Sequence, residues 1–130
     1  MNTRLAATLL AITLIAGCTL PPPGLIDVAE RPAEKALLAG MRAYDDAQYP
    51  QAEKLLTQAL QSGLASPRDR AAARKHLAFI YCTSARLSAC EAEFRAARVD
   101  DPGFALSKSE AGHPQWGPVW QKIAGQAARR

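Results

Sequence analysis

Apolar residues recur every three or four positions from Pro32 onward, which is the spacing of an amphipathic helix. No stretch shows the sustained apolar and polar alternation that is typical of a half-buried strand. The sequence therefore predicts an all-α domain over residues 32–130. The first two apolar stripes comprise Ala36, Leu37, Gly40, Ala43 and Tyr44, and Ala52, Leu55, Leu56, Ala59 and Leu60.

Prolines, glycines and capping residues mark where the first helices begin and end. Pro32 fits the first turn of a helix, and Gly63 fits the end of the second one, after a short turn near residue 47. Ser66 and Pro67 predict the N-cap and first residue of a third helix. A fourth is expected to follow directly, so that the helices form two consecutive pairs.

The C-terminal third predicts the fourth helix over residues 87–99 and then a last, capping helix. Ser107 and Glu110 have the spacing of a capping box, and a Gly-His-Pro sequence then breaks the chain. The last helix starts with an apolar side that carries Trp116 and Trp120. We expect this side to cover the face of the fourth helix that the pairs leave exposed.

The two helix pairs resemble each other at an offset of 38 residues. Gly40 and Ala78 occupy the small position of a tetratricopeptide first helix, Tyr81 its aromatic position and Pro102 its terminal proline. We predict two degenerate tetratricopeptide-like hairpins over residues 33–102; the alternative is an unrelated bundle that uses the same small and large residues. The matching second-helix positions are Tyr49, Ala52, Leu56 and Ala59, and Leu87, Cys90, Phe94 and Ala97.

Ahead of this domain, residues 1–17 have the layout of an export signal. A basic start at Arg4 precedes an apolar run that is too short for a bilayer span, which takes about 20 residues. The run ends in Leu-Ile-Ala-Gly-Cys18, which resembles the bacterial lipobox. That resemblance implies that Cys18 becomes the acylated first residue of a lipoprotein; the alternatives are an uncleaved anchor or plain secretion.

Lipidation at Cys18 implies a cellular location. Three acyl chains, at about 0.8 kcal/mol per buried methylene, hold a protein stably on a membrane. Residues 18–31 contain three consecutive prolines and predict an extended tether. Thr19 follows the cysteine, and similarity to bacterial lipoproteins, in which Asp at this position retains the protein, implies the outer membrane with the domain on its periplasmic face.

The remaining cysteines, Cys82 and Cys90, form an even pair in what would be an oxidising compartment, and we expect a disulfide. The alternative is two small buried residues in a helical core. A turn near residue 85 between the third and fourth helices would bring the two cysteines together.

Composition and charge argue against several kinds of function. Without Arg4 the mature chain has 15 basic and 12 acidic side chains, a net charge of +3, with no basic stripe or motif for nucleic acid. His76 and His113 lack partners at ligand spacing, so no metal or cofactor is expected. No catalytic motif is present, so an enzyme is not expected. The basic residues Arg68, Arg70, Arg74 and Lys75 are interpreted as a solvated face; the alternative is a contact site for a partner with an acidic surface.

Residues 112–118 combine two glycines, two prolines and a tryptophan, which indicates a rigid turn. One interpretation is structural: the turn positions Trp116 against the last repeat, with His113 hydrogen-bonded nearby. The other makes His113, Trp116 and Trp120 a recognition edge for a partner, because aromatic side chains are favoured anchors in interfaces.

Further residues carry a resemblance to a known family, beside the lipobox and the helical repeats. They are residues 76–82, Cys90, Phe94, Arg95, Asp101, Pro102, Phe104, Leu106, residues 110–114, Trp116, Gly117 and Pro118. Together these features look like the type VI secretion-associated lipoproteins of the TssQ family. The resemblance implies an accessory, protein-binding part of a contractile secretion machine at the outer membrane.

Binding would then take place in the groove lined by the first helix of each repeat. A second hypothesis is a pilotin or outer-membrane assembly lipoprotein of another envelope machine. A third, an enzyme or a cell-wall sugar binder, requires a pocket of converging carboxylates and aromatics that the sequence does not show.

Overall fold

The computed structural model describes residues 31–129, and the secondary structure of this part of the chain is all α-helix, without strands, as predicted. None of its helices has the length and hydrophobicity needed to cross a membrane. The export signal, Cys18 and the tether up to residue 30 lie outside the described residues. The helices are α2 (Pro32–Asp45), α3 (Tyr49–Gln61), α4 (Pro67–Thr83), α5 (Leu87–Asp100), α6 (Lys108–Ala111) and α7 (Gly117–Ala127).

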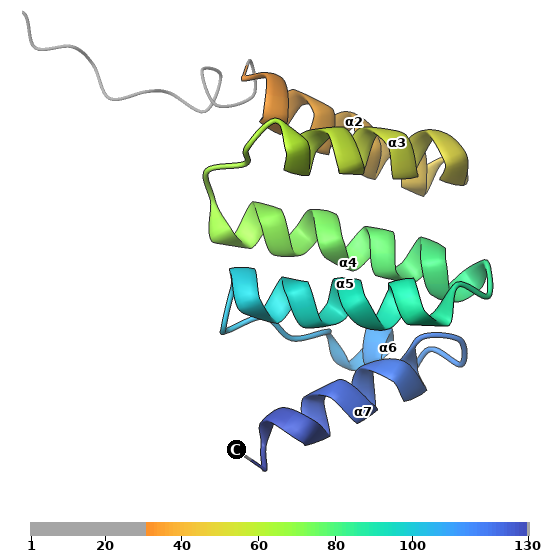
Figure 1. Ribbon diagram of the computed structural model, residues 1–130. Coiled ribbons are helices and arrows are strands. Elements are labelled where there is room, and N and C mark those ends of the chain that lie inside the picture. Colours follow the sequence, from red (N-terminus) through yellow and green to blue (C-terminus); the bar gives the residue numbers. More distant parts are fainter. Residues whose placement is uncertain (1–30, 130) are drawn as a thin grey trace, which may run out of the picture.

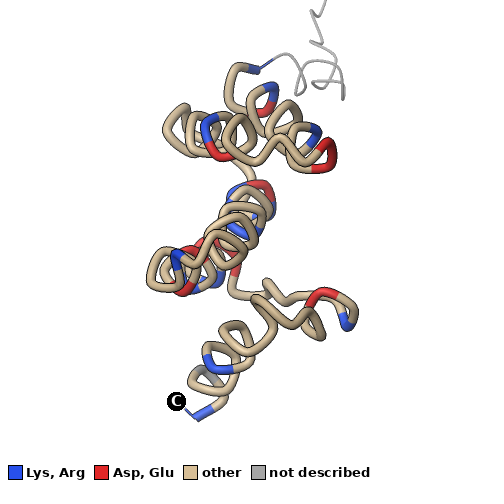
Figure 2. Tube along the Cα trace, turned by 90° about the vertical axis from the view of Figure 1, so that its right-hand side faces the viewer, with Lys and Arg blue, Asp and Glu red and all other residues tan. Residues whose placement is uncertain are grey.

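The helices form a stack of three layers (Figures 1 and 2). The hairpin α2–α3 is the first layer, the hairpin α4–α5 is the second, and α6 and α7 form the third. Helix α3 packs against α4, and α7 packs against α5. The predicted arrangement of two hairpins and a C-terminal capping helix is therefore confirmed.

The turns of the two hairpins repeat each other closely. Ala47 and Ala85, which are 38 residues apart, have φ values of 58° and 60°. The amide that follows each alanine donates a 2.8 Å hydrogen bond to a carbonyl five residues earlier, from Gln48 to Ala43 and from Arg86 to Tyr81. Alanine is strained in the left-handed backbone conformation, so it is uncommon there. Its recurrence 38 residues apart shows that the two hairpin turns have the same backbone conformation.

Small residues bring the paired helices close together. A Cβ atom added at Gly40 would meet the Cγ of Leu56 at 2.9 Å, so α2 passes directly over this leucine. Leu56 and its counterpart Phe94 in the second hairpin are completely buried. The small residues that flank them are completely buried as well: Ala52, Ala59, Cys90 and Ala97. The repeating small and large residues thus form the interior of each hairpin.

A continuous series of aromatic contacts joins the layers. It starts at Tyr44 in α2, whose ring centroid lies 5.1 Å from that of His76 in α4. From His76 it passes to Phe79 and then to Phe94 in α5, at 6.2 and 6.1 Å. Trp120 of α7 lies 5.5 Å from Phe94 and is 7% exposed. The last helix therefore covers α5 through its apolar side, as predicted.

Replacing Trp120 by Ala is expected to destabilise the domain by about 3 kcal/mol or more, because the change removes a buried ring between α5 and α7. Val99→Ala is the control, since Val99 is 81% exposed on α5. Chemical denaturation of both variants measures the effect. An equal and small loss in both would contradict the buried position of the indole.

Candidate protein-binding surface

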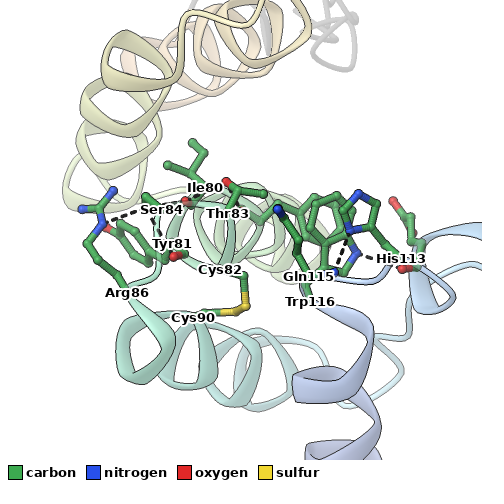
Figure 3. Close-up of a disulfide and its surroundings, with 12 residues drawn as sticks. Ile80, Tyr81, Cys82, Thr83, Ser84, Arg86, Cys90, His113, Gln115 and Trp116 are labelled. Carbon is green, nitrogen blue, oxygen red and sulfur yellow. Dashed lines mark hydrogen bonds between the residues drawn. A yellow bond between two sulfur atoms is a disulfide. The ribbon is translucent and has the colours of Figure 1, made fainter.

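The turn that precedes α7 is held by a stack of three rings (Figure 3). The indole of Trp116 lies between the ring of His113, at 3.4 Å with an interplanar angle of 3°, and the ring of Phe79, at 4.1 Å and 20°. Its Nε1 donates a 2.8 Å hydrogen bond to the carbonyl of Glu110. The backbone amide of Gln115 donates to Nδ1 of His113 at 3.2 Å. These contacts fix the turn against α4.

Gly117 lets the turn close. Its amide donates a 2.8 Å hydrogen bond to the carbonyl of His113. A Cβ atom at this position would meet the carbonyl oxygen of Ala111 at 2.5 Å, a separation that packed atoms do not tolerate. The glycine in the Trp-Gly-Pro sequence is therefore required by the close approach of α6 to the start of α7.

Trp116 and Trp120 are 8% and 7% exposed, so neither indole is available as an anchor for a partner. His113 is half-buried on top of Trp116. Of the two interpretations of this segment, the geometry favours the structural one, in which the turn seats Trp116 on the second repeat. The recognition edge expected from His113, Trp116 and Trp120 is thus largely internal to the domain.

The inner face of α4, which was expected to line a binding groove, is covered by the chain itself. Lys75 Nζ lies 2.7 Å from Glu110 Oε1, and Phe79 lies under Trp116. Burial raises the pKa of Glu110, but the hydrogen bonds from Lys75 and Ser107 and the charge of Lys75 together outweigh it, so the pKa of this carboxyl is lowered. Residues 107–116 therefore occupy the part of the groove that belongs to the second repeat.

The interpretation of the basic residues of α4 as a solvated face is wrong for three of the four. Arg70 Nε lies 3.0 Å from Asp100, Arg74 contacts both Asp100 and Glu93, and Lys75 is paired as described above. Burial raises the pKa of Asp100, but hydrogen bonds from Arg74 and Arg70 outweigh it and leave the pKa lowered. These ion pairs fasten the start of α4 to the end of α5, and Arg68 alone remains exposed.

Cys82 and Cys90 are joined by a disulfide that closes the α4–α5 hairpin, with their Cα atoms 5.2 Å apart (Figure 3). Both residues are buried and belong to the same apolar core as Phe94 and Trp120. In the turn between α4 and α5, Arg86 lies over the ring of Tyr81 and pairs with Glu53 of α3. The turn is therefore fixed both within the second repeat and to the first.

A shallow groove of about 330 Å³ runs between the start of α5 and the start of α7. Leu87 at its edge is 57% exposed, although its repeat position suggested a packed residue. Lys122 Nζ pairs with Glu91 at 3.1 Å across the groove. The lining residues are Leu87, Ser88, Glu91, Pro118, Val119 and Lys122. Pro118 and Val119 lie in the segment that was considered as a recognition edge, but none of the lining residues was named as a partner-binding candidate, because the groove depends on where α7 docks.

The described residues contain no group of three or more His, Cys, Asp or Glu side chains that could hold a metal ion. Comparison of the chain with protein-family models, with curated proteins and with solved structures finds no match. The case for function therefore rests on the residues and their geometry.

In the native protein, Cys82 and Cys90 are expected to resist alkylation until reductant is added. Closing a loop of about nine residues contributes roughly 2 to 3 kcal/mol, so reduction should lower the melting temperature as well. Mass spectrometry after alkylation, with and without reductant, measures the first effect. Free thiols in the untreated protein would contradict the disulfide.

The domain is expected to lose stability as pH falls from 7.5 to 5.5, because of His76. Burial lowers the pKa of this side chain below its ordinary 6.5, although the hydrogen bond of Nδ1 to Ala72 O favours the charged form. Folding thus favours the neutral ring. The contribution of neutral His76 to the free energy of unfolding is complete above pH 6.5, and it is lost as the pH falls below 6.5 and the ring becomes protonated. His76→Gln should flatten the melting-temperature profile over this range; an unchanged slope would contradict the assignment.

Proposed function

We propose that this protein is a lipid-anchored adaptor of the bacterial cell envelope that binds a protein partner and performs no chemistry. Two observations, taken together, give the proposal its main support. The lipobox at Cys18 implies export to an oxidising compartment, and the Cys82–Cys90 disulfide is a bond that persists in such a compartment. The two features are independent of each other and agree.

The groove between α5 and α7 is the surface that we assign to the partner. It exposes Leu87 and the apolar faces of Pro118 and Val119 beside the Glu91–Lys122 ion pair. An apolar side chain from a helical or extended segment would fill the groove, with polar contacts to the ion pair at its edge. The disulfide and Trp120 keep both walls in place, so little would have to be ordered on binding.

Within this class we propose an accessory lipoprotein of a type VI secretion system. Support comes from the resemblance to the TssQ family and from the fixed turn of residues 110–118, one of the segments that carries it. The turn requires both its glycine at position 117 and its indole at position 116.

Capture from solubilised native membranes, with the lipidated protein as bait, tests the proposal. We expect acylated Cys18 in the intact mass of the bait and baseplate or membrane-complex proteins of the secretion system among the captured proteins. Leu87→Glu with Val119→Glu should reduce their recovery at least tenfold. Leu38→Glu with Val99→Glu is the matched control, because these two apolar residues are exposed outside the groove.

Recovery of pilus or barrel-assembly components alone would replace the type VI assignment by a pilotin or assembly lipoprotein. Equal losses with both double variants would remove the groove as the partner surface. An unmodified Cys18, or a leader still attached, would remove the lipid anchor.

A further inference from the structure

One end of the helical stack collects the starts of α2 and α4 and the ends of α5 and α7 (Figure 1). The Arg70–Asp100 ion pair places the start of α4 beside the end of α5. Lys122 pairs with Glu91, and Arg95 donates to Gln126, so α7 runs parallel to α5 and ends on the same side. We call this the anchor end, because the chain leading back to Cys18 leaves the domain here, at Arg31.

The anchor end is basic. Four basic residues lie there exposed, and none of them forms an ion pair with another described residue: Arg31, Lys35, Arg68 and Arg129. Arg98 also lies at this end, half-buried with its guanidinium 6.0 Å from the ring of Trp120.

The carboxylates of the anchor end are less exposed than its unpaired basic side chains. Glu34 is buried, and Asp100 is held by Arg70 and Arg74. Asp69 and Asp101 are only partly exposed; Asp101 also accepts a hydrogen bond from the amide of Gly103. No acidic side chain at this end is as exposed as its four unpaired basic ones.

The opposite end of the stack, which carries the two hairpin turns, faces the viewer in Figure 2 and has exposed residues of both signs. Asp45 and Asp46, at the end of α2, are the most exposed acidic residues of the described chain, and Arg42 in the last turn of α2 is exposed near them. Arg86 at this end is paired with Glu53. Exposed basic residues without equally exposed acidic neighbours are therefore a feature of the anchor end.

We propose that the anchor end docks on the anionic phospholipid headgroups of the membrane that Cys18 enters. The proposal rests on the proposed lipid anchor for its location. Arg31 lies 13 positions after Cys18, a reach of at most about 45 Å. This length lets the domain approach the bilayer without forcing its orientation, so the charges of the domain decide which end touches.

Electrostatic attraction to a membrane acts within about 8 Å at physiological ionic strength, so only side chains at the contacting end take part. Each basic residue near an anionic surface strengthens binding about fivefold. With the anchor end on the membrane, Leu87 and the groove at the starts of α5 and α7 face away from the bilayer. Docking would therefore present the proposed partner surface to the periplasm.

Vesicle co-sedimentation with the mature chain carrying Cys18→Ser tests the docking without the lipid. Vesicles of equal phosphatidylglycerol and phosphatidylethanolamine should retain the protein at low salt and release it at 0.5 M NaCl, and phosphatidylcholine vesicles should not retain it. Arg31→Glu, Lys35→Glu and Arg68→Glu together should weaken binding at least tenfold.

Arg42→Glu, Lys54→Glu and Lys108→Glu form the matched control, since these residues are also exposed, lie away from the anchor end and produce the same change in net charge. This triple variant should weaken binding less than threefold, with circular dichroism confirming that both variants fold. Equal weakening by both variants, or no retention of the parent chain, would overturn the proposal. Because the assay uses lipid-free protein, its outcome is separate from the mass measurement at Cys18.

Discussion

The contact between Phe79 and Trp116 is the interaction on which the rest of the structure depends. Two helical hairpins are too few for a repeat array to be stable unaided, so the third layer must be attached firmly. Phe79 contacts Trp116 on one side and Phe94 on the other, and the chain from residue 107 to α7 is positioned by this stack. Without it, the groove between α5 and α7 would lose one wall.

Basic side chains that the sequence pattern indicates as a solvated face instead reinforce the stack. Arg70 and Arg74 pair with Asp100 of α5, and Lys75 pairs with Glu110 of α6. Helix α4 is therefore connected by ion pairs to both α5 and α6. These pairs are partly shielded from water, which makes them stronger than pairs on an open surface. The charged face of α4 therefore contributes to the assembly of the domain rather than to its solubility.

The helices and the repeat could be predicted because their signals are local. The spacing of apolar residues predicted the five main helices, and the small residues at positions 40 and 78 predicted closely packed hairpins. The 38-residue offset between the repeats recurs in the turns at Ala47 and Ala85. The disulfide was expected from the parity of the cysteines, although two unpaired cysteines remained an alternative to it.

What could not be predicted depends on contacts between distant segments. The partners of Arg70 and Lys75 lie 30 and 35 residues away, so spacing gives no sign of them. Whether Trp116 was buried or exposed depended on where the turn at residues 112–117 directs it. The groove beside Leu87 arises only when α7 docks, and its residues were assigned to other roles or to none.

The disulfide also makes the two hairpins mechanically unequal. It closes α4–α5 covalently, whereas α2–α3 contains no cysteine and is held by packing and by hydrogen bonds at its turn. A pulling force applied at Arg31 would load α2 first, because Arg31 directly precedes this helix. The α2–α3 hairpin would then yield before α4–α5, and the covalently closed hairpin and the groove beside it would keep their shape.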